Sequence, residues 1–262
     1  MRAIRLLLLH VKLAGLTELQ YRANLVAQLI QSVVTAVLSI VSTQLVFAHT
    51  TSLGGWSRGE LYVVVGCWFV VTAFVQALVN PPIQYFATRI NQGDFDYVLV
   101  RPEDAQALMS VQAVEPWPLV NVPVGIGFIA YGLNDSAHLQ ASPLTIGATV
   151  FTMLCGVVML YSIMLLLATL CFWFIRVADL LFAVSDTFDA GRWPLGMFPP
   201  WLRLVLVSIV PIGLAVTVPA QTLLGRARWE DIALSVGVTT VLFIASRRFF
   251  RLGIRHYSGA SS

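Results

Sequence analysis

The feature that most constrains this chain is a set of long runs without charged side chains. Two of these runs extend from Asn24 to Phe47 and from Leu144 to Phe174. An α-helix rises 1.5 Å per residue, so about 20 apolar residues cross the hydrocarbon core of a bilayer. Charged residues make up only 11% of the chain, and its mean hydropathy is +0.80. This composition leaves too little polar surface for a soluble globule and predicts an all-α polytopic membrane protein.

Several classes of site are excluded by the composition. The net charge is a modest +3 and the basic residues are scattered, which argues against a surface for nucleic acid. Lys12 is the only lysine and no glycine-rich loop precedes it, so the phosphate-binding G-x-x-x-x-G-K-[ST] motif is missing. The three cysteines, Cys67, Cys155 and Cys171, lie in apolar runs as small core residues. We therefore expect no catalytic site, no metal site and no cofactor in this chain.

The apolar runs and the residues that interrupt them predict one transmembrane domain over residues 1–262. A basic, amphipathic segment at 1–22 is expected to lie along the membrane interface. Spans are expected at 24–47, 61–79, 111–131, 144–174 and 229–246, and a basic tail at 247–262 is expected in the cytoplasm. Prolines near its start predict that the third of these spans is kinked or begins late.

The distribution of basic residues predicts the orientation. With the N-terminus inside, only Arg58, Arg226 and Arg228 of the 16 basic residues lie on the external side. The excess of arginine and lysine inside follows the positive-inside tendency of membrane proteins. Both termini are therefore expected in the cytoplasm, together with the polar segment from Pro81 to Asp104.

The segment 176–224 has two interpretations. Hydropathy favours one span over 201–224, with 176–200 as a cytoplasmic loop. The repeated prolines instead favour a shorter span at 177–192 followed by a hairpin at 199–224 that enters the membrane and returns to the external side. The second interpretation moves Arg192 and Arg203 outside.

The polar segment from Pro81 to Asp104 interrupts the apolar sequence between two predicted spans. Apolar residues recur at helical spacing from Ile83 to Ile90, which predicts a surface helix, and Gly93 can form the turn that ends it. The region 83–104 is either a structured contact surface or an ordinary solvated loop.

Four acidic residues fall close to membrane depth: Glu115, Asp179, Asp186 and Asp189. Charged groups there are costly, which suggests a water-filled path or a contact with a partner. The alternative is that all four lie at span ends.

Three segments of the chain resemble a known family. They are INQGDFDYVLVRP at 90–102, FWFIRVADL at 172–180 and the proline-rich run at 192–225 with the basic tail behind it. Together they resemble the permease subunits of type-2 ABC exporters, in particular a bacterial branch of uncharacterised or multidrug ABC permeases. The resemblance implies six transmembrane helices, an amphipathic interfacial helix, a cytoplasmic coupling helix and a re-entrant external hairpin before the last span.

The resemblance also implies partners and roles for particular residues. Two copies of a separate ABC ATPase subunit would bind ATP and Mg, and a second permease, identical or homologous, would complete the path among the membrane lipids. Segment 90–102 would dock on the ATPase, and prolines would form the re-entrant gate. The implied coupling residues are Asn91, Gln92, Gly93, Asp94, Phe95, Asp96, Arg101 and Pro102, and the implied gate residues are Pro199, Pro200, Pro211 and Pro219.

The expected function is therefore export across a bacterial cytoplasmic membrane. The external loops are short, which suits export of an amphipathic compound or lipid better than import from a capture domain. Two other classes stay open: an ion- or proton-coupled secondary transporter that uses the four acids, and a membrane assembly factor that transports nothing.

Overall fold

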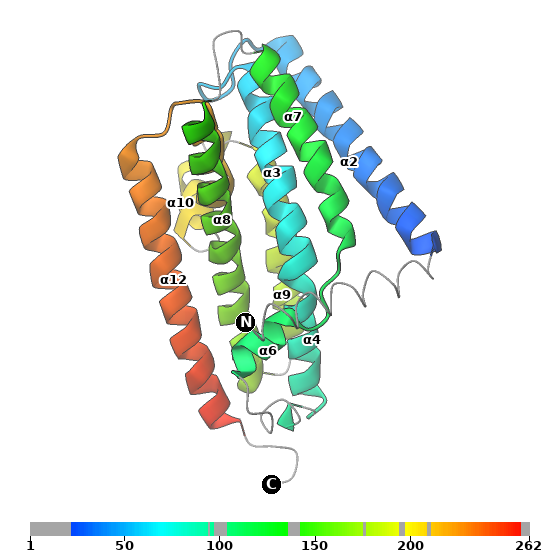
Figure 1. Cartoon of the computed structure of the whole chain (residues 1–262), viewed down its shortest axis with the longest axis vertical. Coiled ribbons are helices and arrows are strands. Elements are labelled where there is room, and N and C mark those ends of the chain that lie inside the picture. Colours follow the sequence, from blue (N-terminus) through cyan, green and yellow to red (C-terminus); the bar gives the residue numbers. More distant parts are fainter. Residues whose placement is uncertain are drawn as a thin grey trace.

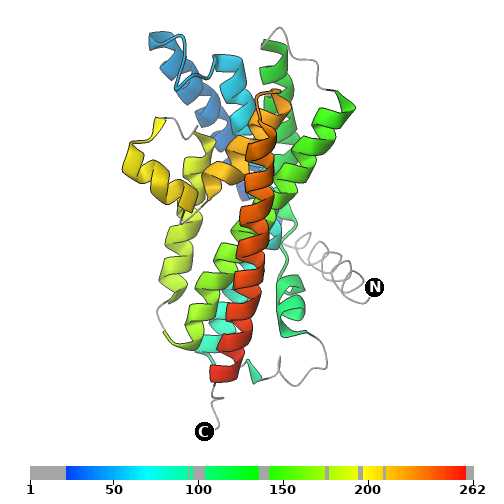
Figure 2. The ribbon, with the colours of Figure 1, turned by 90° about the vertical axis from the view of Figure 1, so that its left-hand side faces the viewer.

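The computed structural model describes residues 22–93, 95–96, 104–135, 142–174, 177–193, 197–208 and 211–257 (Figures 1 and 2). Within these ranges the chain forms α-helices and short 3-10 helices, without a β-strand. In chain order these helices are α2 (Arg22–His49), α3 (Arg58–Leu78), α4 (Asn80–Asn91), α6 (Ala105–Val111), η1 (Trp117–Val120), α7 (Asn121–Asp135), α8 (Pro143–Thr169), η2 (Leu170–Phe172), α9 (Val177–Thr187), η3 (Phe188–Arg192), α10 (Pro200–Ser208), α11 (Ile212–Leu223) and α12 (Trp229–His256).

Four helical stretches in the described ranges are long and apolar enough to cross a bilayer. They are Val26–His49, Arg58–Asn91, Pro143–Phe172 and Trp229–His256. A shorter apolar helix occupies Ile212–Leu223. The chain is therefore an all-α membrane protein, which confirms the fold class predicted from its sequence.

Helix α3 lies at the centre of the molecule and buries most of its residues. It packs antiparallel against α7 through glycines that let the two backbones touch. A Cβ atom placed on Gly125 would lie 2.7 Å from the carbonyl oxygen of Gly66, and one on Gly132 would lie 2.4 Å from that of Gly59. Only glycine fits such an approach, so these residues fix α3 and α7 as one unit.

Helix α8 holds the second group of helices together. Helix α12 runs beside it in the same direction, and the hydroxyl of Thr239 donates to the carbonyl oxygen of Cys155 at 3.3 Å. On another side α8 contacts α11, where a Cβ atom on Gly156 would lie 2.7 Å from the carbonyl oxygen of Ala215. Helices α8, α11 and α12 therefore form a second packed group beside α3.

Ion pairs gather at the end of the molecule where α3 begins, the upper end in Figure 1. Arg58 pairs with Asp135 at the end of α7 at 2.9 Å. Arg226, in the turn between α11 and α12, pairs with Glu60 at 2.6 Å. Two of the three arginines expected outside thus lie at this end, and the third, Arg228, is the N-cap residue of α12.

The third expected span, 111–131, begins late, because its long α-helix starts only at Asn121 and continues to Asp135. Helix α6 ends at Val111, a non-helical segment follows, and η1 leads into α7 at Asn121. Pro116 and Pro118 lack the amide hydrogen that a helix needs. The long helix therefore begins later than residue 111, as expected from these prolines.

The proline-rich segment does not form one helix over 201–224. Helix α10 ends at Ser208 and α11 begins at Ile212, with Pro211 as its N-terminal cap. The two helices meet at an angle in Figure 2, where α10 is yellow and α11 orange. The range 201–224 therefore contains two helices rather than one uninterrupted helix.

Two further predictions differ from the structure or lie beyond it. Helix α12 does not end at Ser246 but continues to His256, so the first part of the expected tail is helical. The expected interfacial helix at 1–22 lies outside the described residues apart from Arg22, which begins α2.

Candidate functional site

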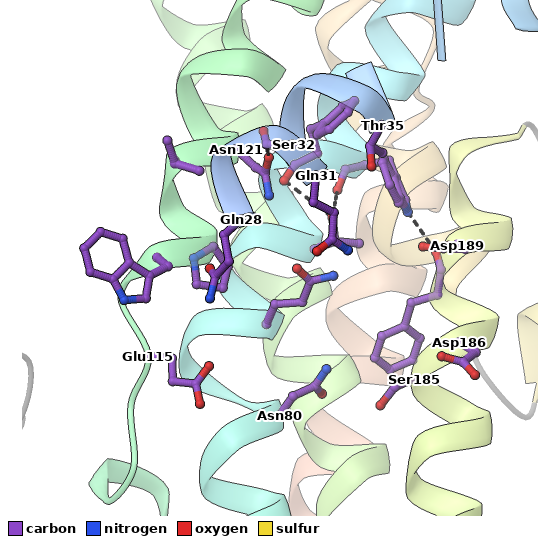
Figure 3. A pocket seen from close by; sticks show the side chains of 18 of the residues that line it. Gln28, Gln31, Ser32, Thr35, Asn80, Glu115, Asn121, Ser185, Asp186 and Asp189 are labelled. Atoms are coloured by element: carbon purple, nitrogen blue, oxygen red, sulfur yellow. Dashed lines mark hydrogen bonds between the residues drawn. The ribbon is translucent and has the colours of Figure 1, made fainter. Parts of the chain in front are cut away.

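A polar cavity of about 740 Å³ lies between α2, α3, η1, η3 and the end of α9 (Figure 3). Its lining combines carboxylates, amides, hydroxyls and a few aromatic rings. The lining residues are Ala27, Gln28, Gln31, Ser32, Thr35, Leu38, Trp68, Phe69, Thr72, Gln76, Asn80, Pro81, Gln84, Glu115, Trp117, Pro118, Val120, Asn121, Ser185, Asp186, Phe188, Asp189 and Arg192.

One wall of the cavity is a polar stripe along α3 and α4. Thr72, Gln76, Asn80 and Gln84 are spaced four residues apart, which places their side chains on one face of a nearly continuous helix. Gln76 is exposed, whereas its neighbours Val75 and Ala77 are fully buried. The polar stripe therefore faces the cavity while the rest of α3 faces the core.

The opposite wall comes from α2. Gln28, Gln31, Ser32 and Thr35 recur at three- and four-residue spacing on this helix and line the cavity. The hydroxyl of Ser32 donates to the side-chain oxygen of Asn121 at the start of α7. This hydrogen bond ties α2 to the rest of the molecule, although most of the described residues of α2 expose their side chains.

Three of the four predicted pathway acids meet at this cavity. Glu115, Asp186 and Asp189 line it, whereas Asp179 lies earlier on α9 and is absent from the lining. Glu115 is placed by its backbone, since its amide donates to the carbonyl oxygen of Ala77 at 3.0 Å. Figure 3 shows Glu115 and Asp186 on opposite sides, with Asn80 between them in this view.

The helical turn η3 is attached to the middle of α3. The indole Nε1 of Trp68 donates to the carbonyl oxygen of Phe188 at 2.8 Å. Arg192 pairs with Asp189 at 3.0 Å, and its guanidinium lies 4.8 Å from the centre of the Trp68 ring. These contacts fix the acid-bearing end of η3 beside the cavity.

The charges of the described lining residues do not balance. Three carboxylates face one guanidinium, that of Arg192, which pairs with Asp189. Glu115 and Asp186 form no ion pair with another described residue. Amides and the rings of Trp68 and Trp117 complete the wall. This mixture suits a solute that carries both polar and apolar groups.

Within the described ranges no three His, Cys, Asp or Glu side chains come together as metal ligands. Cys67, Cys155 and Cys171 are free thiols.

The four predicted gate prolines lie around the junction of α10 and α11. Pro199 precedes α10, Pro200 begins it, Pro211 caps α11 and Pro219 lies inside α11. None of them lines the cavity. The junction nevertheless touches η3, because a Cβ atom on Gly191 would lie 2.5 Å from the side chain of Ile212.

The described coupling residues lie at the opposite end of the molecule from the ion pairs of Arg58 and Arg226. Asn91 is the last residue of α4, Gln92 caps it, and Gly93 turns the chain with a φ of 77°, which glycine adopts readily. The side chains of Asn91 and Gln92 are exposed. Asp94, Arg101 and Pro102 fall outside the described residues.

Phe95 does not face outward as a docking residue would. Its side chain is fully buried in an aromatic cluster formed by Phe86, Phe95, Phe172, Phe250 and Tyr257. The centre of its ring lies 5.3 Å from that of Phe86 and 5.6 Å from that of Phe172. Asp96, in contrast, is partly exposed.

The far side of the coupling region is also anchored. Asp104 caps α6 by accepting hydrogen bonds from the amides of Gln106 and Ala107, and it pairs with Arg247 of α12 at 2.8 Å. Burial alone would raise the pKa of Asp104. The hydrogen bond from Ala107 and the charge of Arg247 outweigh burial, so the pKa lies below its ordinary value.

A family model for ABC-2 family transporter proteins matches residues 33–261. The chain belongs to this family. Membership identifies it as an ABC-2 type permease subunit and implies ABC ATPase components as its partners. Comparison with curated proteins found no match.

Sequence reasoning missed several residues of this ABC-2 permease that the structure brings to its sites. The polar stripe on α3 and α4 could have been found, because its four-residue spacing is visible in the sequence. Arg192 was noted only for its charge. The contacts of Phe95 with Phe172 and Tyr257 join residues distant in the chain, and no local pattern shows them.

Proposed function

We propose that this ABC-2 permease is the membrane subunit of an ATP-driven exporter and that its polar cavity forms part of the export path. The observation that carries the proposal is the cavity itself, which lies beside the central residue Trp68 of the most buried helix and contains three carboxylates. Ionisable groups at such a place in a membrane protein mark a substrate or ion pathway.

In this proposal six helices cross the membrane: α2, α3, α7, α8, α9 continued by η3, and α12. The N-terminal segment 1–22 lies along the interface. Helices α10 and α11 form the re-entrant hairpin, with its turn at Pro211 near the middle of the membrane. Support comes from the contact of Ile212 with η3 at one end of α11 and the ion pair of Arg226 with Glu60 just beyond the other.

Coupling to ATP hydrolysis is assigned to segment 90–102. The exposed residues Asn91 and Gln92, together with the acid Asp96, would meet the ATPase, and Asp94, Arg101 and Pro102 complete the predicted surface. Two ATPase subunits would bind ATP and Mg, and a second permease, identical or homologous, would close the path. Phe95 would support the coupling turn from inside the permease.

The predicted direction is export through a bacterial cytoplasmic membrane, with both chain termini in the cytoplasm. The loops 50–57 and 224–228 at the proposed external end are short, which leaves no capture domain there. An amphipathic solute, drug or lipid fits a wall of amides, carboxylates and tryptophans better than a purely apolar molecule does.

An ion- or proton-coupled secondary transporter is the second candidate. It is favoured by the carboxylates of Glu115 and Asp186, which form no ion pair within the described residues. Such groups can bind a cation or a proton during transport. The family match weighs against this candidate, because ABC-2 permeases belong with ABC ATPases.

Purification and reconstitution decide between the two. The tagged permease should be isolated from bacterial membranes together with an ATPase subunit that carries its own Walker A motif. The complex should then hydrolyse ATP in a vanadate-sensitive manner in proteoliposomes. Uptake of a fluorescent amphipathic dye should require ATP on the side of the ATPase. Transport by the permease alone, driven by a pH gradient, would instead support the secondary transporter.

A further inference from the structure

The described residues of the coupling turn, 91–93 and 95–96, are attached to two parts of the permease. Through α4 the turn continues the chain of α3. Through the aromatic cluster Phe95 also touches Phe172 of η2 and Tyr257, the residue that follows α12, and both are distant in sequence. The second attachment joins segments that are distant in the chain, so the sequence of the turn does not reveal it.

The contacts with α12 involve one face of that helix and the residue that follows it. Phe250, Gly253 and Tyr257 recur at three- and four-residue spacing, and the first and last contribute rings to the cluster. Gly253 leaves room for Phe172, since a Cβ atom there would lie 2.5 Å from the ring of Phe172. This face of α12 is therefore shaped to receive the cluster.

Tyr257 makes both an apolar and a polar contact with the turn. The centre of its ring lies 5.4 Å from that of Phe95 in an edge-to-face arrangement. Its hydroxyl donates to the carbonyl oxygen of Gly93 at 3.3 Å. Gly93 has the positive φ that reverses the chain, so this hydrogen bond holds the turn at the point where it bends.

We propose that Tyr257, the residue that follows α12, positions the coupling turn for the ATPase by holding Phe95 and Gly93. Phe250 supports the same cluster through Phe86 and Phe172. The proposal rests on the proposed coupling function of segment 90–102. Tyr257 is a positioning residue in this scheme, because it acts through the turn rather than by touching the ATPase. Docking then depends on α12 as well as on the residues of the turn.

Helix α12 is also connected by packing to the cavity. Helix α12 contacts α8 at Thr239 and Cys155, α8 contacts α11 at Gly156 and Ala215, and α11 contacts η3. A displacement of the coupling turn therefore has a packed route to η3 that does not pass through α3. This route makes α12 a second mechanical link between the ATPase and the path.

The first arm of the test uses the isolated permease in nanodiscs. In a version without Cys67, Cys155 and Cys171, spin labels are placed at the exposed positions Thr88 and Arg251, and their distance distribution is measured by electron paramagnetic resonance. We expect a narrow distribution that broadens in Tyr257→Ala. Tyr257→Phe keeps the ring contacts and should stay close to wild type.

The matched control is His256→Ala, because His256 contacts Trp173 rather than the coupling turn. It should leave the distance distribution unchanged. An equally narrow distribution in Tyr257→Ala would overturn the proposal.

The second arm measures docking of the purified ATPase subunit on the same variants. Edge-to-face ring pairs contribute enough that Tyr257→Ala and Phe95→Ala should each weaken docking about two- to tenfold. Their double variant should be no weaker than the worse single variant, because both remove the same support. Phe95→Leu keeps much of the buried volume, so it should bind the ATPase more tightly than Phe95→Ala does. This second variant keeps the test valid if Phe95→Ala fails to fold.

The two arms separate failure of this inference from failure of the proposed function. If the wild-type permease binds no ATPase, the coupling function is wrong, whatever the spin labels show. If the wild type binds the ATPase and Tyr257→Ala binds equally well despite a loosened turn, the coupling function stands and the role of α12 is wrong.

Discussion

The indole of Trp68 donates a hydrogen bond to the carbonyl oxygen of Phe188, and this 2.8 Å contact joins the middle of α3 to the turn that carries Asp189 and Arg192. Trp68 is almost completely buried, so the bond is formed away from water. The same ring also carries the guanidinium of Arg192 on its face. One side chain thus fixes a wall of the cavity to the most buried helix.

Trp68→Phe should loosen this wall without removing the core packing. The loss of one buried hydrogen bond and one cation–π contact predicts a decrease in the free energy of unfolding of about 0.5–2 kcal/mol. The measurement is unfolding of the purified permease by titration with sodium dodecyl sulfate. Trp201→Phe is the control, because Trp201 is 67% exposed. Equal decreases in the free energy of unfolding for the two variants would show that the hydrogen bond to Phe188 does not stabilise the permease measurably.

The glycine contacts between α3 and α7 can be tested by comparing two glycine-to-alanine variants of α7. Gly125→Ala places a methyl group 2.7 Å from the carbonyl oxygen of Gly66, whereas Gly127→Ala meets no atom within 4 Å. Overpacking of this kind costs about 1–3 kcal/mol. We therefore expect Gly125→Ala to lower the melting temperature in detergent and Gly127→Ala to leave it unchanged. A loss of stability in Gly127→Ala alone would contradict the packing of α3 on α7.

The acids of the cavity provide a functional comparison. Glu115→Gln and Asp186→Asn remove charge from the lining with little change in shape, and each should lower ATP-dependent dye transport or shift its pH dependence. Asp179→Asn is the matched control, since Asp179 does not line the cavity. Transport is measured over a pH series in proteoliposomes. Wild-type transport rates in both cavity variants, or an effect confined to Asp179→Asn, would show that the cavity is not part of the export path.

The sequence predicts the helical membrane class because apolar runs leave the chain few alternatives. Runs such as Leu144 to Phe174 are too long and too apolar for a soluble fold, and α8 with η2 occupies that range. Prolines also act locally. Pro116 and Pro118 prevent α7 from starting before Asn121, and this effect does not depend on which helices α7 packs against. These features depend on the bilayer and the backbone and not on distant residues.

The sites are less predictable because they depend on contacts between distant segments. Asp179 and Asp186 look equivalent in the sequence, and only the position of η3 against Trp68 brings the second beside the cavity. Phe95 looks like an exposed docking residue between two acids. Its burial follows from Phe172 and Tyr257, which are distant from it in the chain.

The last prediction concerns the side of the membrane on which the segment between η3 and α10 lies. In the hairpin arrangement α10 begins near the external face, the chain turns at Pro211, and α11 returns to the same face close to Glu60. The exposed Met197 should then face the outside of the cell.

The test of this placement is a cysteine at Met197, in a version without Cys67, Cys155 and Cys171, treated in intact cells with a membrane-impermeant maleimide. Cysteines at the exposed Ser52 and Thr88 serve as external and cytoplasmic controls. Labelling that matches Ser52 supports the hairpin and the external ends of α10 and α11. Labelling that matches Thr88, and therefore occurs only after the cells are opened, would place Met197 in the cytoplasm. The chain would then have to cross the membrane between Met197 and Arg226, which pairs with Glu60 at the external end.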